Sequence, residues 1–151
     1  MFPSESKKGG IIIFHSEEID FELKEVDLKT SWLKKIIEQE NMTLLLLNFI
    51  FCSDEYLHKI NVEYLQHDTY TDIITFPLSE LPNIEGDIFI SIDRINENAK
   101  RFQVSFEEEF NRVLSHGVLH LCGYGDKTEE EAKLMREKEN EALSLLESLI
   151  E

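Results

Sequence analysis

Residues 116–126 read HGVLHLCGYGD, with His116 and His120 four positions apart and Asp126 beyond a glycine. On a helix, residues four apart lie on the same side, separated by about 40° of rotation and one turn of rise. Gly123 is expected to end the helix, because glycine takes the left-handed conformation without steric cost. The chain can then turn back toward the histidines. The spacing HxxxHxxGxxD therefore predicts that His116, His120 and Asp126 bind one divalent metal ion.

Three protein ligands leave a fourth position for water, which is typical of a catalytic rather than a structural zinc. The alternative is that both histidines merely cap or line the edge of a buried helix. Cys122 could be proposed as a thiolate ligand. We expect it instead to be a small core residue, because it follows Leu121 on the packed side.

The apolar residues that precede the histidines also predict a helix. They form one stripe at helical spacing, consisting of Phe106, Phe110, Val113, Leu114, Gly117 and Leu121. His116 and His120 fall beside this stripe, about 80° away. They are therefore expected at the rim of the core, where a ligand has a dry supporting side and an open solvent side.

Other segments predict alternating strands and helices. Strands are expected at 10–14, 19–24, 43–51, 72–77 and 86–91, and the nearly all-apolar run 43–51 is typical of a strand buried on both faces. Helices are expected to begin at Thr30 or Ser31, at Ser53, near Asp93, at Ser105 and at Thr128. The pattern predicts an α/β (α+β) fold, with a small, mostly mixed four-stranded sheet covered by several helices and the metal site at a helix end.

The last predicted helix carries a buried stripe of Met135, Ala142, Leu146 and Leu149, and we expect the glutamates around it to form a solvated face.

Length and composition limit the class of protein. The 151 residues predict one domain, 1–151, with 1–9 as a loose polar leader. Cys52 and Cys122 both lie in apolar segments, which favours a reducing cytoplasm. No apolar run reaches the roughly 18 residues of a membrane span, so no membrane partner is expected. The net charge of −16 is unusual for a nucleic-acid binder, because such proteins are usually basic.

Three motifs, in order along residues 43–140, resemble the YbeY endoribonuclease family, also described as rRNA maturation factors. The family signature HGxLHLxGYDH is met by residues 116–124, a Thr-Asp-Val-Leu-Ser-Phe-Pro-like strand by 71–77, and a Gly-Asp-Ile strand by 86–91. The spacing of Asp54-Glu55 and Asn61 is also similar. The resemblance implies a cytoplasmic, single-strand-specific endoribonuclease with one Zn²⁺ per chain. Such an enzyme would act in rRNA maturation and ribosome quality control, with the ribosome, and ribosomal or assembly-factor proteins, as partners.

Two positions depart from the family. Asp126 stands where the family has its third histidine. Aspartate is a competent zinc ligand, but its negative charge makes the metal centre less positive. We therefore expect activity that is weaker or needs higher pH, and manganese as a slightly better competitor. Leu65 stands where the family places an arginine, and leucine cannot contact a phosphate.

Local basic residues are candidates for RNA contact despite the acidic total, because phosphate contacts need only local positive charge. The candidates are Arg94, Lys100, Arg101, Arg112 and, on the loop that follows Leu65, His67. The alternative is that the four basic residues belong to ordinary surface helices and that His67 is a plain loop residue.

The predicted mechanism is metal-assisted phosphodiester hydrolysis, and the general base is not assigned. Asp72 and Asp87 are candidates, although each is expected to have a structural role at a strand start. Two other hypotheses stay open, a non-catalytic ribosome-assembly factor with a structural metal and a metzincin-like protease. Gly117 argues against the protease, because HExxH proteases carry a glutamate at that position.

Overall fold

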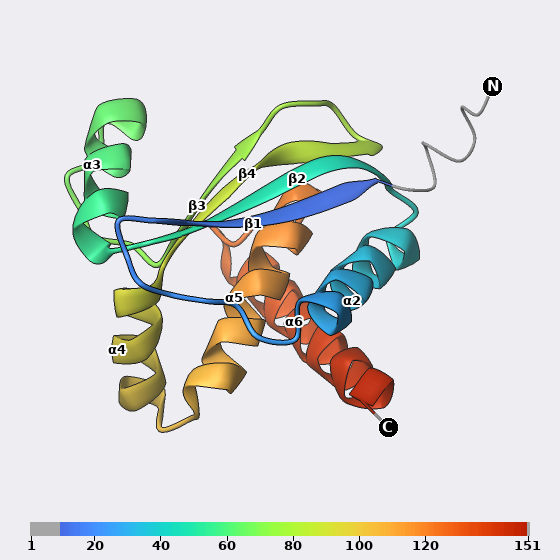
Figure 1. The fold of residues 1–151 in the computed structure, drawn as a ribbon. Helices are drawn as coiled ribbons and strands as arrows, with labels where there is room; N and C mark the ends of the chain where they lie inside the picture. The colour runs from blue at the N-terminus through green and yellow to red at the C-terminus, as the bar shows by residue number, and fades with distance from the viewer. Residues whose placement is uncertain (1–9, 151) are drawn as a thin grey trace.

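The computed structural model describes residues 10–150, in which four strands form one sheet (Figure 1). The strands are β1 (Ile11–Glu17), β2 (Thr43–Cys52), β3 (Ile73–Pro77) and β4 (Asn83–Ser91). They are ordered β1-β2-β4-β3, with β1, β2 and β4 parallel and β3 antiparallel to β4. The predicted mixed, four-stranded sheet is confirmed. The predicted leader, 1–9, lies outside the described residues, and the single domain 1–151 stays a prediction.

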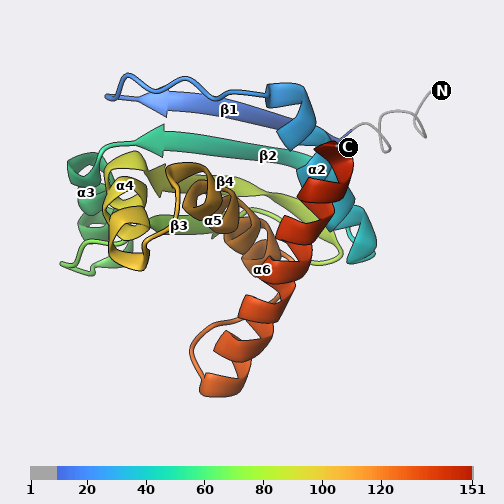
Figure 2. The ribbon, with the colours of Figure 1, turned by 90° about the horizontal axis from the view of Figure 1, so that it is seen from below.

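Five helices accompany the sheet in the described range 10–150. They are α2 (Val26–Gln39), α3 (Asp54–Leu65), α4 (Ile92–Phe102), α5 (Phe106–Leu121) and α6 (Glu129–Ile150). In Figures 1 and 2, α2, α4, α5 and α6 gather on one side of the sheet, whereas α3 lies at one end. None of these helices is long and apolar enough to cross a membrane.

The burial of β2 corrects one prediction. Along this strand Leu47, Phe49 and Phe51 are buried, whereas Leu45 is 40% exposed. The expectation of burial on both faces was therefore wrong. The physical reason is that the main helical layer covers one face of the sheet, while α3 packs a separate small core against Cys52 and Ile74 at one end.

The segment between β1 and α2 differs from the sequence-based expectation in two respects. Residues 19–24 form no strand, although they were predicted to, and Ile19, Phe21 and Leu23 pack instead against the core as irregular chain. Phe21 meets Phe51 edge to face, with ring centroids 5.2 Å apart. Helix α2 begins at Val26 after Glu25 rather than after Thr30 or Ser31. The alternating apolar residues of this segment are buried by packing against the core and not by pairing with a neighbouring strand.

Helix α5 occupies the centre of the helical layer, where it packs against α2, α6 and the sheet. Ser105 caps it as predicted, because its Oγ accepts a hydrogen bond from the Glu108 amide at 3.0 Å. Gly117 allows the close approach of α5 to the sheet. A Cβ at that position would lie 2.9 Å from Ile73 Cδ1 and 3.1 Å from Ile88 Cδ1. The buried surface of α5 is wider than the predicted stripe, and Val118 and Leu119 are also buried.

Candidate metal centre

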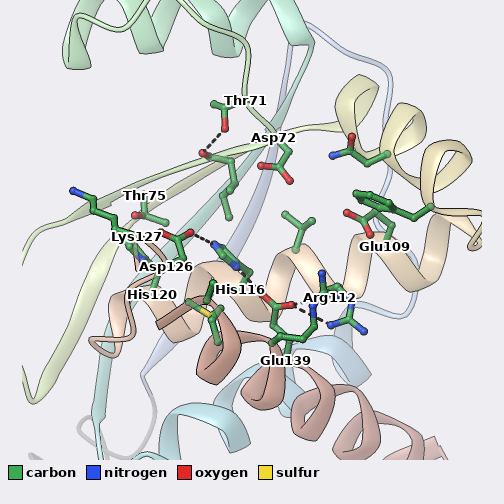
Figure 3. Close-up of a pocket in the computed structure, with 17 residues that line it drawn as sticks. Thr71, Asp72, Thr75, Glu109, Arg112, His116, His120, Asp126, Lys127 and Glu139 are labelled. Atoms are coloured by element: carbon green, nitrogen blue, oxygen red, sulfur yellow. Dashed lines mark hydrogen bonds and ion pairs between the residues drawn. The ribbon is translucent and has the colours of Figure 1, made fainter. Parts of the chain in front are cut away.

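A cavity of about 520 Å³ lies along α5 between β3, α4 and α6, and we call it the α5 pocket. Figure 3 shows Asp126 and His120 toward one end and Glu109 toward the other. The imidazole rings of His116 and His120 both line it, are nearly parallel (5°) and have centroids 6.3 Å apart. His116 is partly buried and His120 is exposed, so both lie at the rim of the core, where the sequence placed them.

Each imidazole is held through its Nδ1 atom. His116 Nδ1 lies 2.7 Å from Glu139 Oε2, and His120 Nδ1 lies 3.0 Å from the carbonyl oxygen of Tyr124. A carbonyl oxygen can only accept, so His120 Nδ1 carries the hydrogen, and the neutral ring keeps a free lone pair on Nε2. The carboxylate of Glu139 favours the same tautomer in His116. Such partners are typical of metal-binding histidines, because they fix the ring and leave Nε2 for the metal.

The turn that follows α5 carries Asp126 back to the histidines. Gly123 has φ of 111°, the Tyr124 amide donates to the Leu119 carbonyl at 3.1 Å, and the Gly123 amide donates to the His120 carbonyl at 3.0 Å. These two bonds form a Schellman motif, which requires the left-handed residue that glycine supplies. Asp126 Oδ2 consequently lies 3.4 Å from His116 Nε2. The predicted helix stop and the return of the chain are both present.

A capping box closes the same turn from its far side. The Glu131 amide donates to Thr128 Oγ1 at 3.1 Å, and the Thr128 amide donates to Glu131 Oε1 at 3.3 Å. The reciprocal pair fixes the start of α6. Asp126 therefore lies in a short link between two well-defined helix ends.

The donor set fits a divalent ion in chemistry, although it is not a ready-made cage. Within residues 10–150 no three His, Cys, Asp or Glu side chains are arranged to hold a metal as they stand. Two ligands bound at about 2.0–2.2 Å to one tetrahedral ion lie roughly 3.4 Å apart. His116 and Asp126 already have that separation. Bringing His120 into the same coordination sphere requires its side chain to turn toward them.

Glu139 belongs to the candidate site, although the sequence predicted that the glutamates of this helix form a solvated face. It is 5% exposed, and its second oxygen, Oε1, accepts a hydrogen bond from Arg112 Nη1 at 3.1 Å. Burial alone would raise the pKa of Glu139, but the hydrogen bonds from His116 and Arg112 hold it below the ordinary value. The signal was present in the sequence, because Glu139 falls on the buried stripe of α6, between Met135 and Ala142.

The same contact acts on His116. Burial lowers the pKa of its imidazole, but the hydrogen bond to Glu139 and the nearby carboxylates outweigh burial, so the pKa is raised. Glu139 therefore strengthens the basicity of the ring that it orients.

The two aspartates considered as general bases lie in different places. Asp72 lines the α5 pocket, and burial raises the pKa of its carboxyl group despite the nearby His116. Asp87 lies on another surface, where it accepts a hydrogen bond from Asn48 Nδ2 at 3.1 Å and lines a separate cavity with His15. Asp87 lies within β4 and contacts a side-chain amide rather than the backbone amides at a strand start that were expected, whereas Asp72 faces the pocket.

The basic residues predicted to contact RNA are not gathered into one strip. Only Arg112 lines the α5 pocket, whereas His67, Arg94, Lys100 and Arg101 do not. Arg94 is instead paired with Asp54 at 2.6 Å. Two cations that the sequence analysis did not select, Lys127 and Arg136, do line the pocket. Local sequence patterns could not identify these two residues, because their place at the pocket depends on how α6 and the turn before it pack against α5.

The family model described as Endoribonuclease YbeY matches residues 12–147. A Flavobacterium johnsoniae protein named Endoribonuclease YbeY is 53% identical over 128 residues, which cover 85% of this chain and 92% of that protein. A Christiangramia forsetii protein of the same name is 53% identical over 136 residues, covering 90% and 94%.

Among solved structures, the solution structure of a Thermotoga maritima protein matches the fold with a TM-score of 0.65 and 28% sequence identity. The match covers 90% of this chain and 89% of that one. The strand and helix arrangement is therefore shared well beyond the motifs around residues 71–77 and 116–126.

Proposed function

Because the chain belongs to the YbeY family of endoribonucleases, we propose that it hydrolyses single-stranded RNA in the α5 pocket with one zinc ion held by His116, His120 and Asp126. The observation that supports the site most directly is the pair of anchored imidazoles, each held through Nδ1 with Nε2 left for a metal. The approach of Asp126 Oδ2 to His116 Nε2 adds an oxygen donor beside them.

A bound zinc would polarise a phosphate oxygen and lower the pKa of a water molecule. The protein supplies orientation around it. Glu139, fixed in turn by Arg112, holds the ring of His116, and the Tyr124 carbonyl holds that of His120. Glu139 limits rotation of the His116 ring, whereas the side chain of His120 must still turn toward His116 and Asp126 before all three can hold one ion.

We assign the role of proton acceptor to Asp72. Its carboxylate lines the pocket wall opposite α5, and a carboxylate of raised pKa retains a bound proton better than an ordinary one. An Asp72 oxygen would take the proton from the attacking water. Lys127 and Arg136, which also line the pocket, supply positive charge for the phosphate oxygens. Arg112 is hydrogen-bonded to Glu139 and Asn140, whereas Arg136 meets Glu139 only at 3.9 Å and is 60% exposed.

The biological setting follows from the family. We propose that the substrate is ribosomal RNA, that the protein acts in rRNA maturation and ribosome quality control, and that it works in the cytoplasm beside the ribosome and its proteins. Single strands are favoured, because a metal at the rim of a pocket reaches a flexible chain more readily than the stacked interior of a duplex.

A second candidate is an assembly factor that binds the ribosome without cleavage. Leu65 in place of the family's arginine and the net charge of −16 favour it. A protease is disfavoured, because the space beside Gly117 is filled by Ile73 and Ile88 and leaves no room for a glutamate.

Metal content and RNA cleavage, measured together, test this proposal. Wild type, His120→Ala and Asp126→Ala are each loaded with zinc, assayed for metal per chain, and incubated with single-stranded RNA, duplex RNA and casein. His15→Ala is the matched control, since this histidine lies on β1 and does not line the α5 pocket.

We expect about one zinc per wild-type chain, cleavage of single-stranded RNA only, and loss of both properties in His120→Ala. Unchanged metal affinity in Asp126→Ala would remove Asp126 from the coordination sphere. Intact RNA with tight ribosome co-sedimentation would favour the assembly factor.

A further inference from the structure

An exposed aromatic ring lines the α5 pocket away from its metal-binding residues. Phe102 is the last residue of α4 and is 56% exposed. Only residues 103–105 separate it from the start of α5, so it lies near the first turns of that helix. An apolar ring left open on a cavity wall is unfavourable in water, and a flat ligand that covered it would recover that free energy.

Two polar side chains share this end of the pocket. Asn98 lies one turn before Phe102 on α4, so both point from the same face of the helix. Glu109, on α5, is only 6% exposed (Figure 3). Neither the Asn98 amide nor the Glu109 carboxylate is hydrogen-bonded to another residue in the range 10–150. Every fully buried side-chain nitrogen or oxygen in that range does have a partner, so the polar atoms of these two side chains are not fully buried. Their polar atoms therefore open on the pocket.

We propose that Phe102, Asn98 and Glu109 form a binding site for one base of an RNA strand, an inference that rests on the proposed function. The ring offers a face on which a base can stack, as is common in single-strand recognition. The Asn98 amide can both donate to and accept from the edge of the base, and the Glu109 carboxylate accepts from an amino group. This combination favours adenine, cytosine or guanine over uracil, which has no amino group.

The length of α5 connects this site to the proposed reaction centre. Glu109 and His116 are seven residues apart, which is nearly two turns, so they share one face about 10 Å apart along the axis. A base held at Phe102 would therefore leave its neighbouring phosphodiester near His116. The cavity of about 520 Å³ is within the range of small-ligand pockets.

Base stacking would also give this acidic protein affinity for RNA. A net charge of −16 offers little long-range attraction for phosphates. Stacking on an aromatic ring does not depend on net charge, so it supplies affinity where electrostatics does not.

Binding measured without cleavage tests this site. Fluorescein-labelled oligo(A), oligo(C) and oligo(U) RNAs of equal length are titrated with the full chain in EDTA, and anisotropy is recorded. Phe102→Leu keeps an apolar side chain without a ring, and Phe102→Trp keeps a ring. Tyr64→Leu is the matched control, since Tyr64 is an aromatic residue of similar exposure (63%) outside the pocket.

We expect Phe102→Leu to weaken binding of oligo(A) by roughly 5- to 100-fold, and Phe102→Trp and Tyr64→Leu to bind like wild type. Glu109→Gln should reduce the preference for oligo(A) and oligo(C) over oligo(U). Wild-type affinity in Phe102→Leu, or equal losses in Phe102→Leu and Phe102→Trp, would overturn stacking. An unchanged preference in Glu109→Gln would overturn reading of the base edge.

Cleavage assays separate this inference from the function on which it rests. RNA cleavage that requires His120, together with wild-type binding by Phe102→Leu, would overturn the base site and leave the endoribonuclease proposal standing. Phe102-dependent binding by a wild-type protein that does not cleave would support the base site and overturn hydrolysis.

Discussion

Two buried charged side chains reach α5 from neighbouring helices and end in different surroundings. Lys29, from α2, is 2% exposed and donates to Glu107 at 2.7 Å and to Asn111 at 2.6 Å. Glu139, from α6, is 5% exposed and contacts His116 and Arg112. Lys29, Glu107 and Asn111 do not line the α5 pocket, whereas Glu139, His116 and Arg112 do. Burial of a charge does not by itself mark a functional site, but Glu139 is a candidate for one because its partner His116 faces the α5 pocket.

Energetics support the same distinction. Buried ion pairs contribute little net stability compared with well-packed apolar residues, because desolvation offsets their attraction. Glu139 lies on the buried stripe of α6, where a leucine would pack at less cost. A glutamate at this position is therefore better explained by orientation of His116 than by stability. Lys29 has no such link to the pocket, so we expect its loss to affect stability alone.

The largest expected effect comes from Asp72→Asn, which tests whether the α5 pocket, where Asp72 lies with Glu139, carries out the proposed hydrolysis. Removing the proton acceptor should lower kcat by roughly 10²- to 10⁴-fold. Steady-state cleavage of a fluorogenic single-stranded RNA by zinc-loaded protein measures this loss. A kcat within twofold of wild type would show that Asp72 is not the general base.

The same variant should be more stable than wild type at neutral pH. Burial raises the pKa of Asp72 above its ordinary value of 3.8, so the folded state prefers the protonated form. Its contribution to stability is present at low pH and is lost as pH rises through the folded-state pKa. The Tm advantage of Asp72→Asn in metal-free protein should therefore grow as pH rises above 3.8, which differential scanning calorimetry over a pH series measures.

Glu139→Gln tests the orienting role and should weaken zinc affinity by roughly 10- to 100-fold. The glutamine keeps the shape of the side chain but loses the charge that favours Nε2 as the metal ligand. Competition with a chromophoric chelator measures the affinity. Glu137→Gln is a suitable control, because this glutamate is exposed on the same helix and does not line the α5 pocket. Equal affinities for Glu139→Gln and wild type would reduce Glu139 to a packing residue.

Lys29→Met tests the buried contact of Lys29 with Glu107 and Asn111. It should lower the free energy of unfolding by about 1–3 kcal/mol, since the buried Asn111 loses its donor. Urea denaturation measures the loss. Zinc affinity and kcat should match those of wild type under conditions where the variant is folded. A change in either would link Lys29 to the pocket and break the contrast with Glu139.

The smallest effect is expected for Thr128→Ala, which removes the side-chain cap of α6 beside Asp126. Loss of a cap costs about 1 kcal/mol. We expect a similar loss in thermal stability, together with less than a threefold change in zinc affinity, because the Schellman turn at Gly123 still directs the link. A larger loss of affinity would show that Asp126 depends on the start of α6 rather than on the end of α5.

The sequence alone determined the features that arise within one or two helical turns. The spacing of His116 and His120, the stop at Gly123, and the caps at Ser105 and Thr128 were all predicted, because each depends on backbone geometry and neighbouring side chains. Only the tertiary structure brought Asp72, Glu139 and Phe102 to the same pocket. Asp72 directly precedes β3, Glu139 lies on α6 and Phe102 ends α4, and their meeting depends on how those elements pack on α5. That packing also decided which face of β2 is buried and left residues 19–24 without strand pairing, because local periodicity specifies which side chains seek burial and not which partner covers them.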